Sequence, residues 1–358
     1  MIVGSEGASP RLSVVVCTYN RYDVLPKAIA SLLAQRLNTV TMEIIVVDNS
    51  SDQIAAGEFA KRYDGLPVRY VLEAKPGLSN ARNVGISASK GELVGFIDDD
   101  AIASPDWASE IVRAFDTFGD RAGSVGGRVL PRWVTERPHW LPDRLLSYLS
   151  IVDWGGELRE LPRHQWLAGC NLAYRRAVLD SVGGFSLTVG RIGPGDVLLS
   201  GEDSDMAAKI AAGGWITLYA PSASVEHAID PARLTPQWFH RRVAWHAVSE
   251  FVLDPERMSR FALVAKERLR LVQGGFKRRV PLGFVAVPDS AAEFEHDVML
   301  TYDLVVAMLA GGVDLEVPPA ENAMAALRIK ALARVRHLAA KRPLFGRLLR
   351  ALYRMKRI

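Results

Sequence analysis

The chain has 358 residues, of which 49% are hydrophobic, and its formal net charge at pH 7 is +4. This length suits one large domain with an appendage, or two domains, and the apolar content excludes a chain that is disordered over most of its length. The charge is uneven, because no acidic residue follows Glu321 whereas Lys and Arg continue to the last residue. We therefore expect an anionic partner for this C-terminal stretch.

Three features bear on the compartment. Cys17 and Cys170 lie in apolar stretches, which indicates core thiols in a reducing compartment rather than a disulfide. The first residues include an acid and no apolar segment, unlike a signal peptide. The longest apolar run, residues 304–313, is shorter than the roughly 20 residues that a membrane span needs. We expect a cytoplasmic protein, soluble or peripheral at the inner face of the cell membrane.

The N-terminal part alternates two patterns. Continuous runs of β-branched residues predict strands, and apolar residues spaced three and four apart predict helices. The predicted strands are 12–17, 43–47, 68–72 and 93–97, and the predicted helices are 24–33, 80–89 and 107–118. Strand, helix and strand in succession are typical of a parallel sheet covered by helices.

The pattern is less regular further along the chain. The Pro- and Trp-rich stretch 131–165 predicts a long excursion, and the Gly-rich residues 186–201 predict a mobile loop. The other predicted elements are a strand at 166–174, a helix at 202–212, edge strands at 215–219 and 223–227, and helices at 236–252, 255–273, 290–311, 320–341 and 343–357. The predicted organisation is a flexible N-terminus (1–11), an α/β domain (12–250), a helical extension (251–319) and a basic amphipathic tail (320–358).

Polar clusters directly follow three of the predicted strands. They are Thr18-Tyr19-Asn20-Arg21, Asp48-Asn49-Ser50-Ser51 and Asp98-Asp99-Asp100, and a fourth cluster, residues 77–82, opens a helix near the same edge. In open α/β sheets, ligands bind outside the carboxyl ends of the strands. A single Asp at a strand end is more often a turn or a helix cap, but four clusters at corresponding ends favour one binding crevice.

The common phosphate-binding loops are absent from the sequence, since no GxGxxG follows the first strand and no GxxxxGK[ST] occurs. Three consecutive Asp residues can instead neutralise a diphosphate through a metal ion. Carboxylate oxygens suit Mg²⁺ or Mn²⁺, and such an ion stabilises charge on a departing diphosphate. The sequence therefore predicts Mn²⁺ or Mg²⁺ at residues 98–100.

A second carboxylate cluster, residues 201–205, lies between the Gly-rich loop and a helix. In one interpretation these acids only complement the helix dipole. In the other, Asp203 is a general base that takes the proton of an attacking sugar hydroxyl. The helix terminus would then lower the pKa of Asp203 and keep it ionised.

Eight segments, in this order and spacing over residues 12–227, resemble the bacterial family-2 glycosyltransferases. They are VVVCTYNR, IIVVDNSS, GLSNARNVG, FIDDDA, WLAGCNLAYRR, VGGF, GEDSDM and AGGW. The resemblance implies an α/β fold of the GT-A type, in which a Rossmann-like mixed sheet is flanked by helices, here followed by a mostly helical C-terminal region. It also implies inverting chemistry, metal dependence and a nucleotide-sugar donor, normally a UDP-sugar.

The resemblance assigns roles on the donor side. Asp48 would recognise the base, Arg82 would lie near the base or the diphosphate, and Asp98 would approach the ribose or the sugar. The full donor-binding set is Thr18, Asn20, Arg21, Asp48, Arg82, Asp98 and Asp99.

Metal and acceptor roles are assigned in the same way. Asp100 would bind the metal, and His227 would complete the metal site, although a lone His at a strand end is about as often structural. Asp203 would be the catalytic base, and Glu202 and Trp166 would lie on the acceptor side.

Two departures from the family pattern stand out. Asn49 occupies the position of a usual second acid, which would alter contacts with the base or ribose. The QxxRW motif of processive synthases is absent, since residues 237–241 do not match it, and this favours adding one sugar or a few.

The expected function is metal-dependent, inverting transfer of one sugar from a UDP-sugar to a hydroxyl of a glycan or lipid-linked glycan, in the synthesis of a cell-surface polysaccharide or glycoconjugate. One alternative is a nucleotidyltransferase with a similar sheet, which would release pyrophosphate. Another is an inactive carbohydrate-binding protein, which the intact triad 98–100, Asp203 and Arg82 disfavour. An NAD-binding enzyme is disfavoured by the missing glycine fingerprint.

The C-terminal tail carries a separate expectation. Apolar residues recur at helical spacing in residues 344–355, and basic residues surround them. This pattern predicts an interfacial helix on an anionic membrane surface. The alternative is that the apolar stripe packs on the helical domain. Aromatic residues are sparse in the tail, so no nucleic-acid partner is expected.

Overall fold

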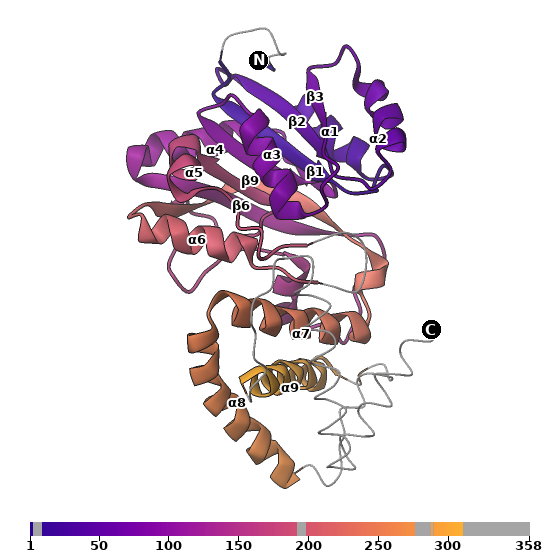
Figure 1. Cartoon of the computed structure of the whole chain (residues 1–358), viewed down its shortest axis with the longest axis vertical. Coiled ribbons are helices and arrows are strands. Elements are labelled where there is room, and N and C mark those ends of the chain that lie inside the picture. The colour runs from indigo at the N-terminus through magenta and orange to yellow at the C-terminus, as the bar shows by residue number, and fades with distance from the viewer. Residues whose placement is uncertain (3–8, 192–197, 276–287, 289, 311–358) are drawn as a thin grey trace. The chain divides into compact units, whose positions relative to one another are not determined.

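The computed structural model describes residues 1–2, 9–191, 198–275, 288 and 290–310 (Figure 1). The chain divides into two compact units, Met1–Thr135 with Leu149–Asp230, and Glu136–Tyr148 with Pro231–Ile358. In the part of the chain described, no helix has both the length and the apolar character needed to cross a membrane.

The first unit is built on one mixed sheet with the strand order β3-β2-β1-β4-β8-β6-β9-β5, and β7 pairs with β9 (Figure 1). Strands β1 to β4 are mutually parallel where they pair, β8 is antiparallel to both β4 and β6, and β9 is parallel to β6. The strands are β1 Leu12–Thr18, β2 Met42–Asp48, β3 Val68–Leu72, β4 Leu93–Asp98, β5 Ala101–Ala103, β6 Ala122–Trp133, β7 Arg159–Glu160, β8 Asn171–Arg175 and β9 Ile216–Ile229. The expected mixed α/β sheet is confirmed.

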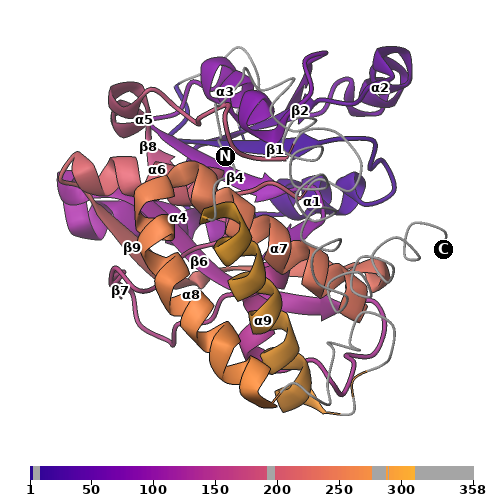
Figure 2. The same cartoon turned by 60° about the horizontal axis from the view of Figure 1, so that its bottom comes forward.

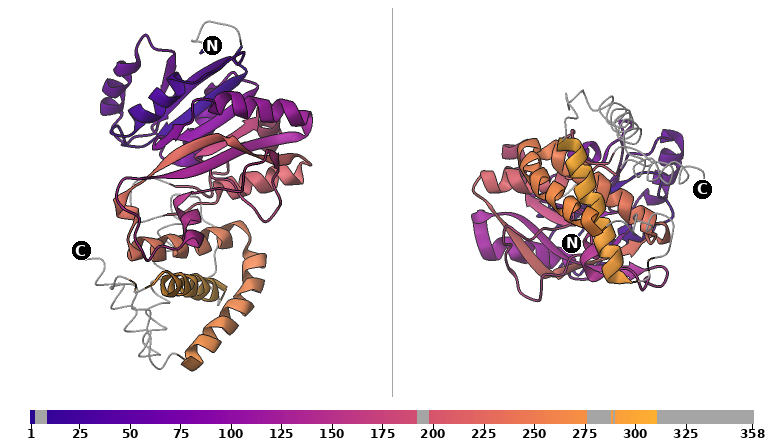
Figure 3. Two further views of the ribbon diagram at one scale, coloured as in Figure 1. Left: turned by 180° about the vertical axis from the view of Figure 1, so that it is seen from behind. Right: turned by 90° about the horizontal axis from the view of Figure 1, so that it is seen from below.

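Helices cover both faces of this sheet (Figure 1, and Figure 3 from behind). They are α1 Leu25–Leu33, α2 Gln53–Ala60, α3 Leu78–Ala88, α4 Trp107–Phe118, α5 Arg176–Val182 and α6 Glu202–Ala212. Gly85 lets α3 approach β1, because a Cβ built there would lie 2.4 Å from Val15. Trp107 of α4 contacts Gly95 from the face of the sheet that carries Leu12. Since side chains alternate along a strand, α3 and α4 lie on opposite faces.

The strands predicted at 12–17, 43–47, 68–72 and 93–97 are all present, and the helices predicted at 107–118 and 202–212 have the predicted bounds. The prediction of two edge strands at 215–219 and 223–227 is wrong. They form a single strand, β9, which lies inside the sheet between β6 and β5. The register with β6 passes from Gly127↔Ala220 to Val129↔Val225, so the intervening residues of β9 form a bulge rather than a break.

The described residues of the second unit form three α-helices, α7 Pro236–Leu253, α8 Pro255–Gly275 and α9 Ala291–Ala310, in which α9 packs against α7 and α8 (Figure 2). They match the helices predicted at 236–252, 255–273 and 290–311. The rings of Trp140, Phe239 and Phe294 meet edge to face in its core, with centroids 4.6–6.0 Å apart. The helices predicted at 320–341 and 343–357 lie outside the described residues, as does part of the loop 186–201.

Candidate active site

The carboxyl ends of β1, β2 and β4 lie side by side at one edge of the sheet. Thr18 pairs in register with Asp48, and Cys17 pairs with Asp98. The three polar clusters that follow these strands are therefore neighbours, as expected from a parallel arrangement.

An arginine links the first cluster to the acidic one. The guanidinium of Arg21 lies 2.7 Å from Asp99 Oδ1 and 2.8 Å from Asp100 Oδ2, and the Thr18 hydroxyl donates to Asp99 Oδ2 at 2.7 Å. Asn20 has a φ of +54°, in the left-handed region that Asn tolerates, and its N–H donates to Ser50. Burial raises the pKa of Asp99 to about 7, although Arg21 acts in the opposite direction.

Three potential metal ligands converge beside this arginine. Ligand atoms of Asp98, Asp100 and His227 all lie within 4.8 Å of one another. His227 faces the acidic turn because β5 pairs with β9 in the register Ala101↔His227, and His227 Nε2 lies 3.2 Å from Asp100 Oδ1. Within the described structure, the buried Nδ1 of His227 has no hydrogen-bond partner. This set of two carboxylates and an imidazole fits a divalent cation.

Arg82 connects the acidic turn to the second carboxylate cluster. Its guanidinium lies 2.8 Å from Asp203 Oδ1, 3.4 Å from Glu202 Oε1 and 3.9 Å from Asp98 Oδ1, and its side chain is only 3% exposed. Asp203 and Glu202 open α6 in its first turn. The structure thus brings the predicted base and the predicted donor side together around one buried cation.

The ionisation of Asp203 differs from the expectation. A lowered pKa was predicted from the helix terminus, but burial raises the pKa of Asp203 to about 6, with Arg82 opposing this and Glu202 adding to it. The side chain keeps 27% of its surface exposed. A carboxylate of this kind is ionised at neutral pH and is more basic than a free Asp.

Asp48, predicted to recognise the base, is fully buried. Its Oδ1 accepts hydrogen bonds from the N–H and hydroxyl of Ser50, and its Oδ2 accepts one from the Tyr70 hydroxyl at 2.6 Å. These contacts organise the strand end from within the protein. Contact between Asp48 and a base stays a prediction.

Asn49 has a role that the sequence did not reveal. Its amide Nδ2 donates to the carbonyls of Glu73 and Lys75, at 2.8 and 2.5 Å, and its Oδ1 accepts from the Gly77 N–H at 2.7 Å. An amide can do this because it both donates and accepts, whereas a carboxylate can only accept. The residue therefore clamps the loop that leads into α3.

Glu202 and Trp166, the two residues predicted on the acceptor side, differ from each other in exposure. Glu202 is buried beside Arg82. Trp166 is 36% exposed, and its carbonyl accepts a hydrogen bond from Trp154 Nε1. An acceptor contact of either residue stays a prediction.

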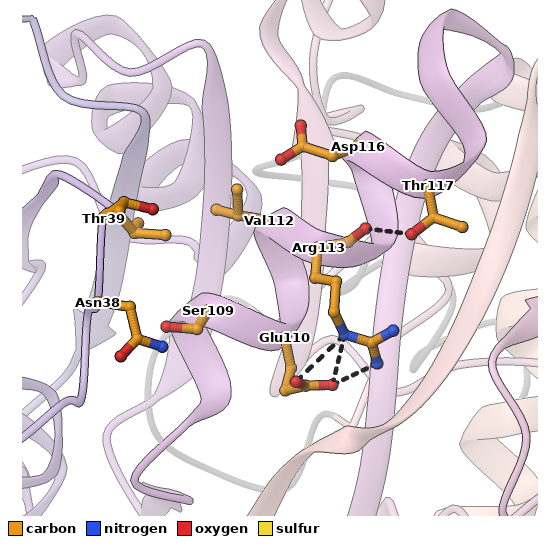
Figure 4. Close-up of a pocket in the computed structure, with 9 residues that line it drawn as sticks. Asn38, Thr39, Ser109, Glu110, Val112, Arg113, Asp116 and Thr117 are labelled. Carbon is orange, nitrogen blue, oxygen red and sulfur yellow. Dashed lines mark hydrogen bonds and ion pairs between the residues drawn. The ribbon is translucent and has the colours of Figure 1, made fainter.

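A surface pocket lies away from these groups, along α4 and the loop 38–40 (Figure 4). Glu110 and Arg113, which line it, form an ion pair. The loop 38–40 precedes β2 at its amino end, opposite the strand ends that carry the acidic residues. The pocket is therefore separate from the candidate active site.

Comparison with known proteins finds glycosyltransferases among the similar sequences. The family model "Glycosyl transferase family 2" matches residues 13–183. The glucosyl-dolichyl phosphate glucuronosyltransferase of Haloferax volcanii is 30% identical over 250 residues, which cover 68% of this chain and 77% of that protein. The succinoglycan biosynthesis protein ExoM of Rhizobium meliloti is 26% identical over 235 residues, covering 64% and 71%.

Among solved structures, the mannosyltransferase PcManGT from Pyrobaculum calidifontis in complex with GDP-Man and Mn²⁺ is 19% identical, with a TM-score of 0.47, and the match covers 97% of this chain and 85% of that one. The sequence matches, which extend over most of the first unit, carry the assignment. The chain belongs to glycosyl transferase family 2 and is a glycosyltransferase.

Proposed function

We propose that this glycosyltransferase is a metal-dependent, inverting enzyme that moves one sugar from a nucleotide-sugar to a hydroxyl of a glycan or lipid-linked glycan. The observation that carries the proposal is the single cluster in which Arg82 joins Asp203 to Asp98, next to Asp100 and His227. The groups proposed to bind the metal and the donor are therefore adjacent to the proposed general base.

The metal would be held by Asp98, Asp100 and His227, with Mn²⁺ or Mg²⁺ as the candidates. The imidazole favours Mn²⁺, because nitrogen ligands suit Mg²⁺ less well. When bound, the ion supplies positive charge that stabilises a departing diphosphate. The convergence of ligand atoms of Asp98, Asp100 and His227 within 4.8 Å of one another supports a cation at this place. Arg21, Thr18 and Asn20 would border the nucleotide.

Asp203 would act as the general base. An acceptor hydroxyl must lose its proton as it attacks the anomeric carbon, and a carboxylate within hydrogen-bond reach accepts that proton. The raised pKa of Asp203 makes it a better proton acceptor than a free carboxylate while leaving it ionised at pH 7. Attack from the side opposite the diphosphate would invert the configuration of the sugar.

The donor and acceptor classes are proposed on other grounds. A UDP-sugar is favoured by the resemblance to family-2 enzymes. A lipid-linked acceptor is supported by the Haloferax volcanii relative, whose name gives glucosyl-dolichyl phosphate. The basic tail, which lies outside the described residues, would then hold the enzyme at the inner face of an anionic membrane.

The test is a screen of nucleotide-sugars that measures released nucleoside diphosphate with Mn²⁺, with Mg²⁺ and with EDTA. Turnover with a metal and none in EDTA is expected, and full activity in EDTA would contradict the metal role. Release of pyrophosphate would identify a nucleotidyltransferase instead. Asp203→Asn should lower the transfer rate by about 10²–10⁴-fold while donor binding survives. Asp205→Asn, on the same helix but paired with Lys209, is the matched control and should change little.

A further inference from the structure

We propose that Arg82 is a positioning residue, which holds the base Asp203 at a set place relative to the donor-side carboxylate Asp98. This inference rests on the proposed role of Asp203 as the base. It assigns Arg82 a task other than the contact with base or diphosphate that the family resemblance implies.

The contacts of Arg82 span both halves of the site. Nη1 lies 2.8 Å from Asp203 and 3.4 Å from Glu202, on the proposed acceptor side, whereas Nη2 lies 3.9 Å from Asp98 on the donor side. Arg82 lies on α3, Asp203 on α6 and Asp98 at the end of β4. A planar guanidinium with a fixed fork of donors sets distances between such partners better than a flexible ammonium does.

The guanidinium is itself held in place. Its Cζ lies 5.1 Å from the ring centroid of Phe185 and 5.9 Å from that of Phe96. Gly169 closes another side: its N–H donates to Asp203, and a Cβ built there would lie 2.4 Å from Asp203 Oδ2 and 2.5 Å from Arg82 Nη2. A side chain at this position would push into the pair. The local structure thus holds Arg82 and Asp203 together.

Electrostatics support the same role. The other ionisable groups that face Asp203 are Glu202 on the same helix, Asp98 on β4, Tyr174 on β8 and the Cys170 thiol. None of these four groups is a cation, so among the ionisable groups of the described residues named here Arg82 is the one that favours the ionised form of Asp203, together with the Gly169 N–H. Removal of Arg82 would raise the pKa of Asp203, because the carboxylate would lose its neighbouring positive charge.

The test compares Arg82→Met, Arg82→Lys and Gly169→Ala with the unaltered enzyme, by kcat, donor KM and the pH dependence of kcat. For Arg82→Met we expect kcat to fall by about 10²-fold or more, since small misplacements of a reacting group have effects of this size. Donor KM should change by less than about threefold, as for an interaction made mainly in the transition state. The acid limb of the pH profile should move above pH 6. Arg82→Lys should keep the limb near pH 6 and recover part of kcat.

Gly169→Ala provides the control for folding, because it retains both side chains and only forces them apart. A fall in kcat with unchanged donor KM is expected for it as well. If Arg82→Met does not fold, as judged by thermal unfolding, the kinetics of Gly169→Ala and Arg82→Lys test the proposal. A donor KM raised about tenfold or more in Arg82→Met, with an unmoved acid limb, would assign Arg82 to the donor and overturn the proposal. A normal kcat in Gly169→Ala would also contradict it.

A further variant separates this inference from the proposed function. Full activity of Asp203→Asn would overturn the assignment of the base itself. A defective Asp203→Asn together with a fully active Arg82→Met would leave the base in place and overturn only the positioning role.

Discussion

Burial and a few guanidinium groups set the charge of the carboxylates in the active site. Asp99 and Asp203 both have raised pKa values, about 7 and about 6, because desolvation outweighs the nearby Arg21 and Arg82. The sequence does not reveal these pKa shifts, since they depend on the side chains that bury the two carboxyl groups. Each carboxyl group therefore changes its charge over its own pH range.

The proposed role of Asp203 as the base predicts the pH dependence of transfer. A base must be deprotonated, so kcat is constant above its pKa and falls as the pH decreases through about 6, by roughly tenfold for each pH unit further below. The measurement is kcat at saturating donor and metal between pH 4.5 and 8.5, with circular dichroism to verify folding at the acid end. A rate that stays constant down to pH 5 would contradict Asp203 as the base.

The hydrogen bonds of Asn49 predict that replacing it with the acid usual in the family lowers the stability of this protein. In Asn49→Asp, two hydrogen bonds to partly buried carbonyls are lost and a carboxylate faces the carbonyl oxygens of Glu73 and Lys75. The free energy of unfolding should fall by about 1–3 kcal/mol, measured by urea denaturation. Asn80→Asp, which removes one exposed donor to the same Lys75 carbonyl, is the control and should cost less. Equal stability of Asn49→Asp and the unaltered protein would exclude the clamp.

Much of the site could be predicted from the residues that follow the strands. Thr18, Asp48 and Asp98 meet because parallel strands end at a common edge, and that edge can be read from the alternation of strands and helices. The pairing of Arg82 with Asp203 could not be read in this way. It joins α3 to α6, a long-range contact that no local pattern reports.

Among the elements, β6 and β9 show where local patterns fail. The start of β6 is rich in Gly and small residues, which have low strand propensity, so no strand was predicted there. In β9 the residues Pro221 and Ser222 suggest the end of a strand, but in the structure they belong to a bulge within one continuous strand. The Asn171 side chain supports this region by donating to the carbonyls of Arg128 and Ala223 and accepting from Trp107.

The junction of β6 and β9 requires a residue without a side chain. A Cβ built at Gly127 would lie 1.7 Å from the carbonyl oxygen of Ala223, so Gly127→Ala must push the strands apart at the bulge. Such overpacking costs roughly 1–3 kcal/mol of unfolding free energy, which urea denaturation would detect. Gly156→Ala is the control, because a Cβ built there meets no atom within 4 Å. Similar stabilities of the two variants would show that the bulge relaxes freely.

For the molecule as a whole, the net charge of +4 hides an unequal distribution along the chain. All charged side chains after Glu321 are basic, whereas three consecutive acids, Asp98, Asp99 and Asp100, lie at the end of β4. The periodic patterns predicted the parallel strands β1 to β4 and the three described helices of the second unit, whereas the mixed sheet was implied by the family resemblance. The sequence could not predict that residues 136–148 join the helical unit, because this depends on packing contacts such as that of Trp140 with Phe294.

The basic tail predicts association with anionic membranes. The full chain should co-sediment with liposomes increasingly as their anionic lipid content rises and less as salt is added, because each basic residue near such a surface contributes about 1 kcal/mol. A chain ending at Pro319 should lose most of this binding. Equal and salt-insensitive partitioning of the two proteins would remove the tail from membrane binding.

The register Ala101↔His227 ties the proposed metal site to the order of folding events. Asp98 and Asp100 come early in the chain, whereas His227 lies near the end of β9, so the three proposed ligands meet only after distant strands have paired. A slip of one residue would turn the imidazole to the other face of the sheet. Collapsed intermediates with incomplete strand pairing would therefore bind Mn²⁺ weakly. The appearance of tight binding during refolding would serve as a kinetic marker for completion of the sheet.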